Sequence, residues 1–164
     1  MKIDYIIPTL YRPTLSRTIA SIQKENVEHN LLIFGTEDSA GFNRNKGLEK
    51  VLDSDWVVFV DDDDYLITGH SKELDEKYDI VILRMKQADK IVPNYSNNSI
   101  EVGNVGINFA LKTSFYKKHK FKFDNEGHEE DWRFLVKVFE KSQKLKVTNK
   151  IYYVAPKINH LKNN

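Results

Sequence analysis

The sequence contains no cysteine, and this absence excludes disulfide bonds, thiolate metal sites and a cysteine nucleophile. An excess of one charge is also missing, because 25 lysines and arginines are balanced by 24 aspartates and glutamates. A chain with a net charge near zero has no general electrostatic attraction to nucleic acid or to an anionic membrane. We therefore expect no nucleic-acid partner.

Long hydrophobic runs are missing as well. No stretch approaches the roughly 18 apolar residues that a transmembrane helix needs. The N-terminal segment MKIDYIIPTLYRP has a short apolar run, interrupted by Asp4 and Pro8, that is too short for the core of a signal peptide. These absences predict a soluble, cytoplasmic protein without a membrane span. The length of 164 residues predicts a single domain over residues 1–164.

The first 60 residues alternate between strand-like and helix-like patterns. β-Branched and aromatic runs predict strands in KIDYIIP, NLLIFG and DWVVFV, and apolar residues at helical spacing predict helices in PTLSRTIASIQKE and GFNRNKGLEKVLD. This alternation predicts an α/β fold with a mainly parallel central sheet. Ligands of such sheets bind beyond the carboxyl ends of the strands. Residues 8–12, 36–41 and 61–64 should therefore converge at one edge of the sheet.

The second half is less regular. We expect strands in YDIVILRM, NFALK and KLKVTNKIYYVAP, and helices in TSFYKKHK and EEDWRFLVKVFEKSQ. The segment KIVPNYSNNSIEVGNVG is polar and rich in turn residues, which predicts loops around a weak hairpin. Helical spacing places Trp132, Leu135, Val136 and Phe139 on one apolar face of the last helix, and places Leu52 toward the core near the end of the second helix.

Four consecutive aspartates, Asp61 to Asp64, directly follow the apolar run VVFV. Adjacent carboxylates repel one another, so a bound cation is the first candidate to offset that repulsion. Alternate residues at the end of a strand point to the same side, which pairs Asp61 with Asp63 and turns Asp62 toward a basic side chain or a backbone amide. The pair suits Mg²⁺ or Mn²⁺ bound together with a diphosphate. The alternative is a solvated acidic turn.

Two further segments carry groups that could meet a nucleotide. In PTLYRP, Tyr11 could stack on a base and Arg12 could grip a phosphate, with a plain turn between two prolines as the alternative. In GFNRNKG, Arg44 and Lys46 lie at the start of a predicted helix, whose N-terminus favours anions. Taken alone, these two residues are better explained as an ordinary solvated basic face.

Three acids, Glu129, Glu130 and Asp131, open the last predicted helix in GHEEDW. Acids at this position stabilise a helix by complementing its dipole, and that explanation is sufficient for the cluster. The functional alternative is a general base, a carboxylate that takes a proton from an attacking hydroxyl.

Taken in order, four segments resemble the glycosyltransferase family 2 type of nucleotide-sugar transferase, which has the GT-A fold. They are IIPTLYRPTLSRTIASI, GFNRNKGLEKV, WVVFVDDDDYL and GHEEDW. The family's Arg-Asn-x-Gly motif is matched at residues 44–47, its Asp-x-Asp-Asp motif at 61–64, and its Glu-Asp-Trp motif at 130–132. The resemblance implies a Rossmann-like three-layer α/β/α sandwich, with a nucleotide-binding part at about residues 1–66 and an acceptor-side part at about 67–164.

The resemblance also implies a reaction: metal-dependent transfer of a sugar from a nucleotide-diphosphate sugar, usually a UDP-sugar, to a glycan or another hydroxyl acceptor. Asp131 would be the base of an inverting displacement, and Glu130 would help to position the acceptor. Asp61 and Asp63 would form the Asp-x-Asp motif, with Asp63 as the direct ligand of Mn²⁺ or Mg²⁺, and His160 would complete the metal shell. The candidate nucleotide-binding residues are Pro8, Thr9, Tyr11, Arg12, Glu37, Asp38, Arg44, Asp61 and Asp62.

Three other functions compete with this interpretation. A haloacid-dehalogenase-like phosphatase also binds magnesium at an Asp-x-Asp strand end, but its motif lies near the N-terminus and is followed by Thr or Val, whereas Tyr65 stands here. A nucleotidyltransferase would need a glycine-rich phosphate loop after the first strand. A non-catalytic nucleotide-sugar-binding module is the third possibility, and the presence of Asp61, Asp63 and Asp131 argues against it.

Overall fold

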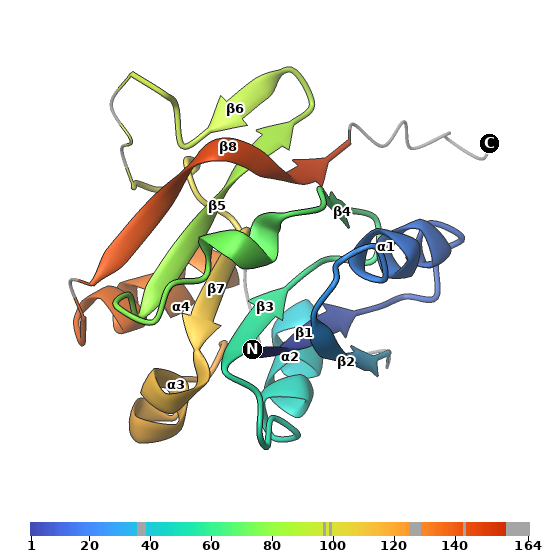
Figure 1. The fold of residues 1–164 in the computed structure, drawn as a ribbon, viewed down its shortest axis with the longest axis horizontal. Helices are drawn as coiled ribbons and strands as arrows, with labels where there is room; N and C mark the ends of the chain where they lie inside the picture. Colours follow the sequence, from blue (N-terminus) through green and yellow to red (C-terminus); the bar gives the residue numbers. More distant parts are fainter. Residues whose placement is uncertain (36–38, 97, 99, 125–128, 143, 157–164) are drawn as a thin grey trace.

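The computed structural model describes residues 1–35, 39–96, 98, 100–124, 129–142 and 144–156. Within these residues the chain forms one sheet with helices on both of its faces (Figure 1). The strands are β1 (Lys2–Pro8), β2 (Glu28–Phe34), β3 (Trp56–Phe59), β4 (Tyr65–Leu66), β5 (Ile80–Gln87), β6 (Lys90–Val92), β7 (Phe109–Lys112) and β8 (Leu145–Ala155). The helices are α1 (Leu15–Ile22), α2 (Ala40–Leu48), α3 (Thr113–His119) and α4 (Glu130–Phe139), and the 3₁₀ helix is η1 (His70–Glu73).

The strand order across the sheet is β2-β1-β3-β7-β5-β8-β4, and β6 pairs with β5. β1 lies parallel to both β2 and β3, and β5 lies parallel to β8. β7 is antiparallel to β3 and to β5, so β1, β2, β3, β5 and β8 all run in one direction. This arrangement confirms the predicted α/β fold with a mainly parallel sheet.

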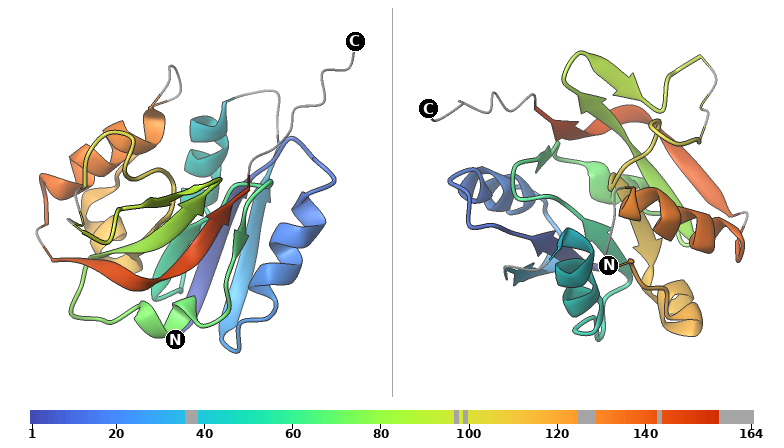
Figure 2. Two further views of the ribbon diagram at one scale, coloured as in Figure 1. Left: turned by 90° about the horizontal axis from the view of Figure 1, so that it is seen from above. Right: turned by 180° about the vertical axis from the view of Figure 1, so that it is seen from behind.

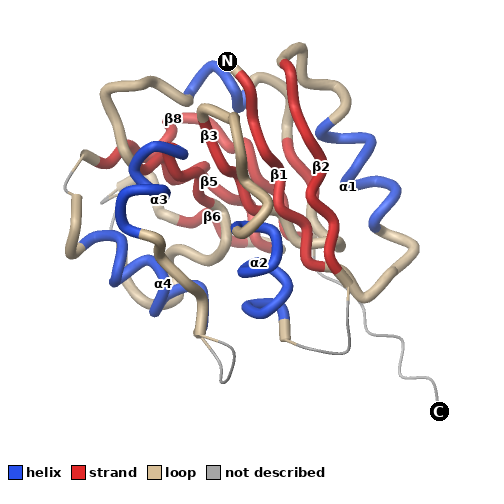
Figure 3. The backbone as a smooth tube through the Cα atoms, turned by 90° about the horizontal axis from the view of Figure 1, so that it is seen from below, coloured by secondary structure: helices blue, strands red, loops and turns tan. Residues whose placement is uncertain are grey.

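The sheet is the middle layer of three. Helices α2, α3 and α4 cover one face, and α1 lies with η1 on the other (Figures 2 and 3). β1 and β3 are covered on both faces and are buried along almost their whole length, as expected for parallel strands that read as continuous apolar runs. Helix α2 packs closely on β1, because a Cβ at Gly47 would come within 2.5 Å of Ile6 Cγ2.

An aromatic cluster fills the layer between the sheet and helix α4. Phe134 of α4 stacks on Phe123 with ring centroids 3.9 Å apart, and it also contacts Phe59 of β3 and Phe109 of β7. All four side chains are buried. This cluster fixes the position of α4 relative to the end of β3, where the aspartate run begins.

Two predicted core faces are wrong in detail. Helix α4 buries Phe134, Leu135 and Val138, whereas Val136 is 37% exposed. Leu52 is 68% exposed, because helix α2 ends at Leu48 and the chain then turns before β3. The spacing of apolar residues predicts a wide apolar stripe along α4. Contact with the aromatic cluster determines which residues of this stripe are buried. No helix in the described part of the chain is long and apolar enough to cross a membrane.

Candidate active site

Described residues from the segments that follow β1, β2 and β3 converge at the carboxyl ends of these strands, as predicted, while residues 36–38 of the second segment lie outside the described part of the chain. The backbone amide of Thr9 donates to the carbonyl of Phe34 over 2.9 Å, which holds the end of β1 beside the end of β2. A cavity of about 470 Å³ opens at this edge of the sheet. Its lining residues are Pro8, Thr9, Leu10, Arg12, Ser39, Ala40, Asn43, Asp61, Asp62 and Asp63.

The aspartate run is a turn and not the end of a strand. β3 ends at Phe59, and the amide of Asp64 donates to the carbonyl of Asp61 over 3.1 Å. The alternation from which the sequence paired Asp61 with Asp63 therefore does not apply. The solvated acidic turn is wrong as well, because Asp62 and Asp64 are 3% and 8% exposed.

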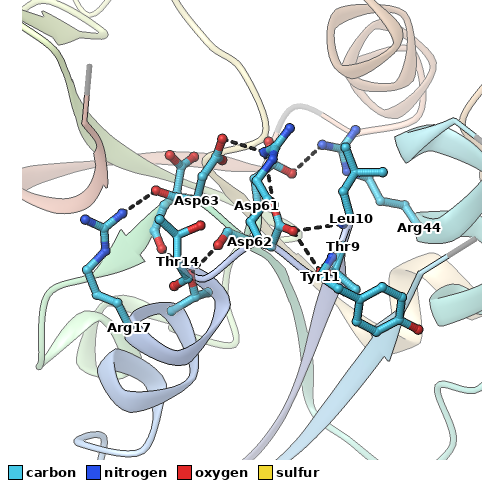
Figure 4. A network of polar contacts seen from close by, with 12 residues as sticks. Thr9, Leu10, Tyr11, Thr14, Arg17, Arg44, Asp61, Asp62 and Asp63 are labelled. Atoms are coloured by element: carbon cyan, nitrogen blue, oxygen red, sulfur yellow. Dashed lines mark hydrogen bonds and ion pairs between the residues drawn. The ribbon is translucent and has the colours of Figure 1, made fainter. Parts of the chain in front are cut away.

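Asp62 anchors the loop that follows β1 (Figure 4). Its Oδ2 accepts from the Thr9 hydroxyl over 2.7 Å and from the Leu10 amide over 2.9 Å. Its Oδ1 accepts from Arg12 over 3.1 Å. The predicted partners of Asp62, a basic side chain and a backbone amide, are both present. Asp62 lines the cavity, but its carboxylate is already engaged by the protein.

The other three aspartates form an acidic cluster. One carboxylate oxygen from each of Asp61, Asp63 and Asp64 lies within 4.8 Å of the other two. Burial raises the pKa of Asp64 to about 8, with a further contribution from the charge of Asp61, and burial also raises the pKa of Asp63. A set of three carboxylate oxygens at this spacing suits a hard divalent cation such as Mg²⁺ or Mn²⁺, which would offset their mutual repulsion.

Two residues outside the aspartate run hold this cluster in place. The hydroxyl of Tyr153 in β8 donates to Asp64 Oδ2 over 2.8 Å and accepts from the Asp61 amide over 3.2 Å. Arg17 of α1 donates to the backbone carbonyl of Asp63 over 2.5 Å (Figure 4). Sequence reasoning missed both residues. Tyr153 is 92 positions from Asp61, so no local pattern connects them.

Arg12 is the cation at the mouth of the cavity. Its Nη1 lies 2.6 Å from Asp63 and 3.1 Å from Asp62, and its side chain is 40% exposed. It is thus placed beside the acidic cluster and keeps contact with solvent. Tyr11, in contrast, is 72% exposed, has φ 57°, and donates its hydroxyl to the Gly35 carbonyl over 3.3 Å, so the structure does not bring it into the cavity lining.

Arg44 connects the acidic cluster to helix α4. Its Nη2 lies 2.6 Å from Asp61, and its Nη1 lies 3.0 Å from Glu130 and 2.8 Å from Asp131. The side chain is 2% exposed, so its interpretation as a solvated basic face is wrong. Lys46 is not part of this network: it lies over the Phe42 ring and lines a different cavity.

Asp131 is a partly buried carboxylate with a raised pKa. It stands in the first turn of α4, after Glu129 in the left-handed backbone region at φ 66°. Burial raises the pKa of the Asp131 carboxyl to about 6, against the lowering effect of the neighbouring Arg44. A carboxylate with a pKa near neutrality can both lose and accept a proton at physiological pH. Glu37, Asp38 and His160, also predicted for the site, lie outside the described residues.

Together, the fold and the arrangement of the site define a class: the chain has the GT-A-like fold of glycosyltransferases. Solved structures of S. aureus TarS, a glycosyltransferase, are among those similar to the chain. TarS 1–349 superposes with a TM-score of 0.78 at 21% identity, covering 95% of this chain and 60% of that one. Its complex with UDP-GlcNAc gives 0.79 at 21% identity, with 96% and 59% coverage. A longer TarS structure gives 0.77 at 20% identity, with 95% and 37% coverage.

This likeness concerns the fold. The chain spans about 60% of TarS 1–349 and 37% of the longer TarS structure, at an identity near 20%. Neither a protein-family model nor a curated protein sequence matches the chain. The predicted membership of glycosyltransferase family 2 therefore stays a prediction.

Proposed function

We propose that the chain is a metal-dependent glycosyltransferase that moves a sugar from a UDP-sugar to a hydroxyl group of a glycan or a similar acceptor. The observation that carries this proposal is the position of Arg44. It joins Asp61 of the acidic cluster to Asp131, so a candidate cation site and a candidate base belong to one ion-pair network. The likeness to TarS structures in complex with UDP-GlcNAc and with UDP supports the donor class.

The cavity at the carboxyl ends of β1 and β3 would hold the donor. Its volume of about 470 Å³ is within the range of small-molecule sites. Arg12 would meet the diphosphate, and the N-terminus of α2, where Ser39 Oγ accepts from the Phe42 amide, would favour the same anion. Asp61, Asp63 and Asp64 would hold Mg²⁺ or Mn²⁺. The cation would supply positive charge against the negative charge of the departing UDP.

Asp131 would act on the acceptor. As the acceptor oxygen forms its bond to the anomeric carbon and the bond to UDP breaks, the Asp131 carboxylate takes the hydroxyl proton. This is a single displacement and inverts the anomeric configuration. Glu130, which shares the Arg44 Nη1 contact with Asp131, would help to orient the acceptor. With a pKa near 6, the base is ionised above this pH and loses its function as the pH falls through it.

The test is the substitution Asp131→Asn, which removes the base and keeps the shape. We expect UDP binding to be unchanged and sugar transfer to fall by about 10²–10⁴, the usual contribution of a general base. Binding is measured by calorimetry with UDP and Mn²⁺, and transfer by release of UDP from a panel of UDP-sugars. Asp75→Asn, at an exposed carboxylate paired with Lys77, is the matched control and should keep full activity.

Two results would contradict the proposal. Full transfer by Asp131→Asn would remove the assigned base. Binding of UDP without turnover of any UDP-sugar and acceptor would instead favour a non-catalytic nucleotide-sugar-binding module. The phosphatase alternative is not favoured, because β1, α1, β2 and α2 all precede the strand that leads into the aspartate run, and Tyr65 follows the run.

A further inference from the structure

Asp131 lines a second cavity, which shares no lining residue with the cavity at the acidic cluster. Its volume is about 280 Å³, enough for part of a saccharide. The residues around it come from the end of β5, from the loop before β7 and from the start of α4, and include Met85, Val102, Gly106 and Trp132. The carboxylate of Asp131 is therefore open to a ligand from this side.

The charge of this second cavity is negative. Glu129 and Asp131 are among its described lining residues, and none of these is a lysine or an arginine. Lys86 lies between Met85 and Gln87 in β5 and so points to the opposite face of the sheet. Lys90 pairs with Gln87 across the β5–β6 hairpin, but it is exposed and is not part of the lining.

Arg44 does not reverse this charge. It is the cation behind Asp131, but its two terminal nitrogens already contact three carboxylates, those of Asp61, Glu130 and Asp131. In the absence of a bound divalent cation, the set of three acids and one arginine has a formal charge of −2. Arg12, the exposed cation of the site, lines the other cavity. A phosphate group placed beside Asp131 would thus meet like charge without a described cation to offset it.

The remaining lining suits the apolar face of a sugar ring. Trp132, Val102 and Met85 all line the cavity; Trp132 is half-buried and Val102 is 54% exposed. An indole packs well on a flat ligand with apolar C–H groups while its N–H remains available for a polar partner. A Cβ at Gly106 would lie 3.8 Å from Asp131 Oδ2 and 3.8 Å from Met85 Cε, so the glycine keeps open the space next to the base.

We infer that the acceptor is an uncharged saccharide whose ring packs against Trp132, and that acceptors carrying a phosphate near the reacting hydroxyl are rejected. This inference rests on the proposed function for the role of Asp131 as the base. The acceptor enters by the second cavity, its hydroxyl reaches Asp131 past Gly106, and Glu129 is available to accept hydrogen bonds from its other hydroxyl groups.

The experiment measures acceptor binding without requiring turnover. Methyl hexosides and their 6-phosphates are titrated against the protein by saturation-transfer NMR. We expect at least one neutral hexoside to bind at least tenfold more tightly than its 6-phosphate. Trp132→Ala should weaken neutral binding at least tenfold. Val102→Lys adds a cation to the cavity and should reduce the preference for the neutral hexoside, measured as the ratio of the two dissociation constants, at least fivefold. Leu52→Lys, at an exposed position outside the cavity, should leave this ratio unchanged.

Each other outcome overturns the inference: no neutral hexoside binds, the 6-phosphates bind as tightly or more tightly, or Val102→Lys and Leu52→Lys have the same effect on the ratio. The proposed function is tested separately by UDP release from a panel of UDP-sugars in the presence of Mn²⁺ and the neutral hexosides. Its failure would appear as a lack of UDP release while the preference for neutral hexosides persists.

Discussion

At the scale of single residues, Arg44 decides how the site is organised. A buried guanidinium is tolerated only when its charge is compensated, and here Asp61, Glu130 and Asp131 compensate it. The arginine in turn lowers the pKa of Asp131, which burial raises. One side chain thus sets both the position and the protonation of the proposed base.

We predict that Arg44→Gln destabilises the fold by about 3–5 kcal/mol, because it leaves partly buried carboxylates without their counter-charge. The pH below which transfer is lost should also rise above its starting value near 6, since the charge that lowers the pKa of Asp131 is gone. Urea unfolding and the pH profile of kcat/KM measure the two effects. Arg44→Lys keeps the positive charge but loses the two-nitrogen contact of the guanidinium, so it should shift the pH profile less than Arg44→Gln does. A loss of stability below 1 kcal/mol would show that the ion-pair network is not structural.

At the scale of elements, a second buried polar cluster joins β1, the end of α1 and η1. The Tyr5 hydroxyl and His70 Nε2 are 2.7 Å apart, and His70 Nδ1 lies 3.1 Å from both Glu25 Oε1 and the Ile67 carbonyl. Glu25 accepts from the amides of Gly69 and Ser71 at 2.8–3.0 Å. The cluster positions α1, whose Arg17 and Thr18 hold the backbone of the aspartate run.

Burial lowers the pKa of His70, so the unfolded chain binds a proton at His70 more readily than the folded protein does. Its contribution to stability is therefore complete above the unfolded pKa of about 6.5 and is lost as the pH falls toward the folded value. We predict that the protein loses about 1 kcal/mol from this source between pH 7.5 and 5.5. The pKa of Glu25 is also lowered, so this carboxylate takes up its proton below the pH range of 5.5–7.5 and does not contribute to the change.

The check is urea unfolding at both pH values. His70→Gln should be less stable at pH 7.5. Acidification raises stability through Asp64 and Asp131, whose pKa values are raised, so the effect of His70 is the difference between the two proteins: the change in stability from pH 7.5 to pH 5.5 should be about 1 kcal/mol more favourable in His70→Gln than in the unmodified protein. His119→Gln, in α3, is the control and should keep the slope of the unmodified protein. If the free energy of unfolding changes with pH by the same amount in His70→Gln and in the unmodified protein, the pH dependence comes from other groups.

Prediction of the elements from the sequence succeeded where the pattern was long. β1, β5 and β8 have runs of β-branched and aromatic residues, and the structure confirms them. The strand β4 and the helix η1 were not predicted, because two and four residues are too short to show a period. They exist because β4 pairs with β8 and because Glu25 fixes the start of η1.

At the scale of the whole molecule, the acidic cluster is assembled from both ends of the chain. Tyr153 comes from β8 and Arg12 and Arg17 from the first βα unit, while the aspartates follow β3; Figure 1 shows these elements. A ligand that binds this cluster should therefore stabilise the entire fold, since it binds the folded state and not the unfolded one.

We predict that Mn²⁺ and UDP together raise the melting temperature, by an amount that corresponds to about 2.7 kcal/mol when the free ligand reaches 100 times its dissociation constant. Scanning fluorimetry measures the shift, and EDTA should abolish most of it. Asp63→Asn and Asp64→Asn should each reduce the shift, whereas Asp75→Asn should not. An undiminished shift by UDP in EDTA would exclude metal-dependent binding.

The sequence by itself determined the α/β class, the order of the longer strands along the chain and the convergence of three segments at one edge, because these follow from apolar periodicity and from the geometry of parallel strands. Only the tertiary structure decided which acids act together. The aspartates form a turn, so Asp62 faces the protein while Asp64 joins the cluster through Tyr153. The tertiary structure also buries Arg44 between Asp61 and Asp131. These contacts join residues 17 to 89 positions apart, and their selection depends on packing and burial, which no local pattern contains.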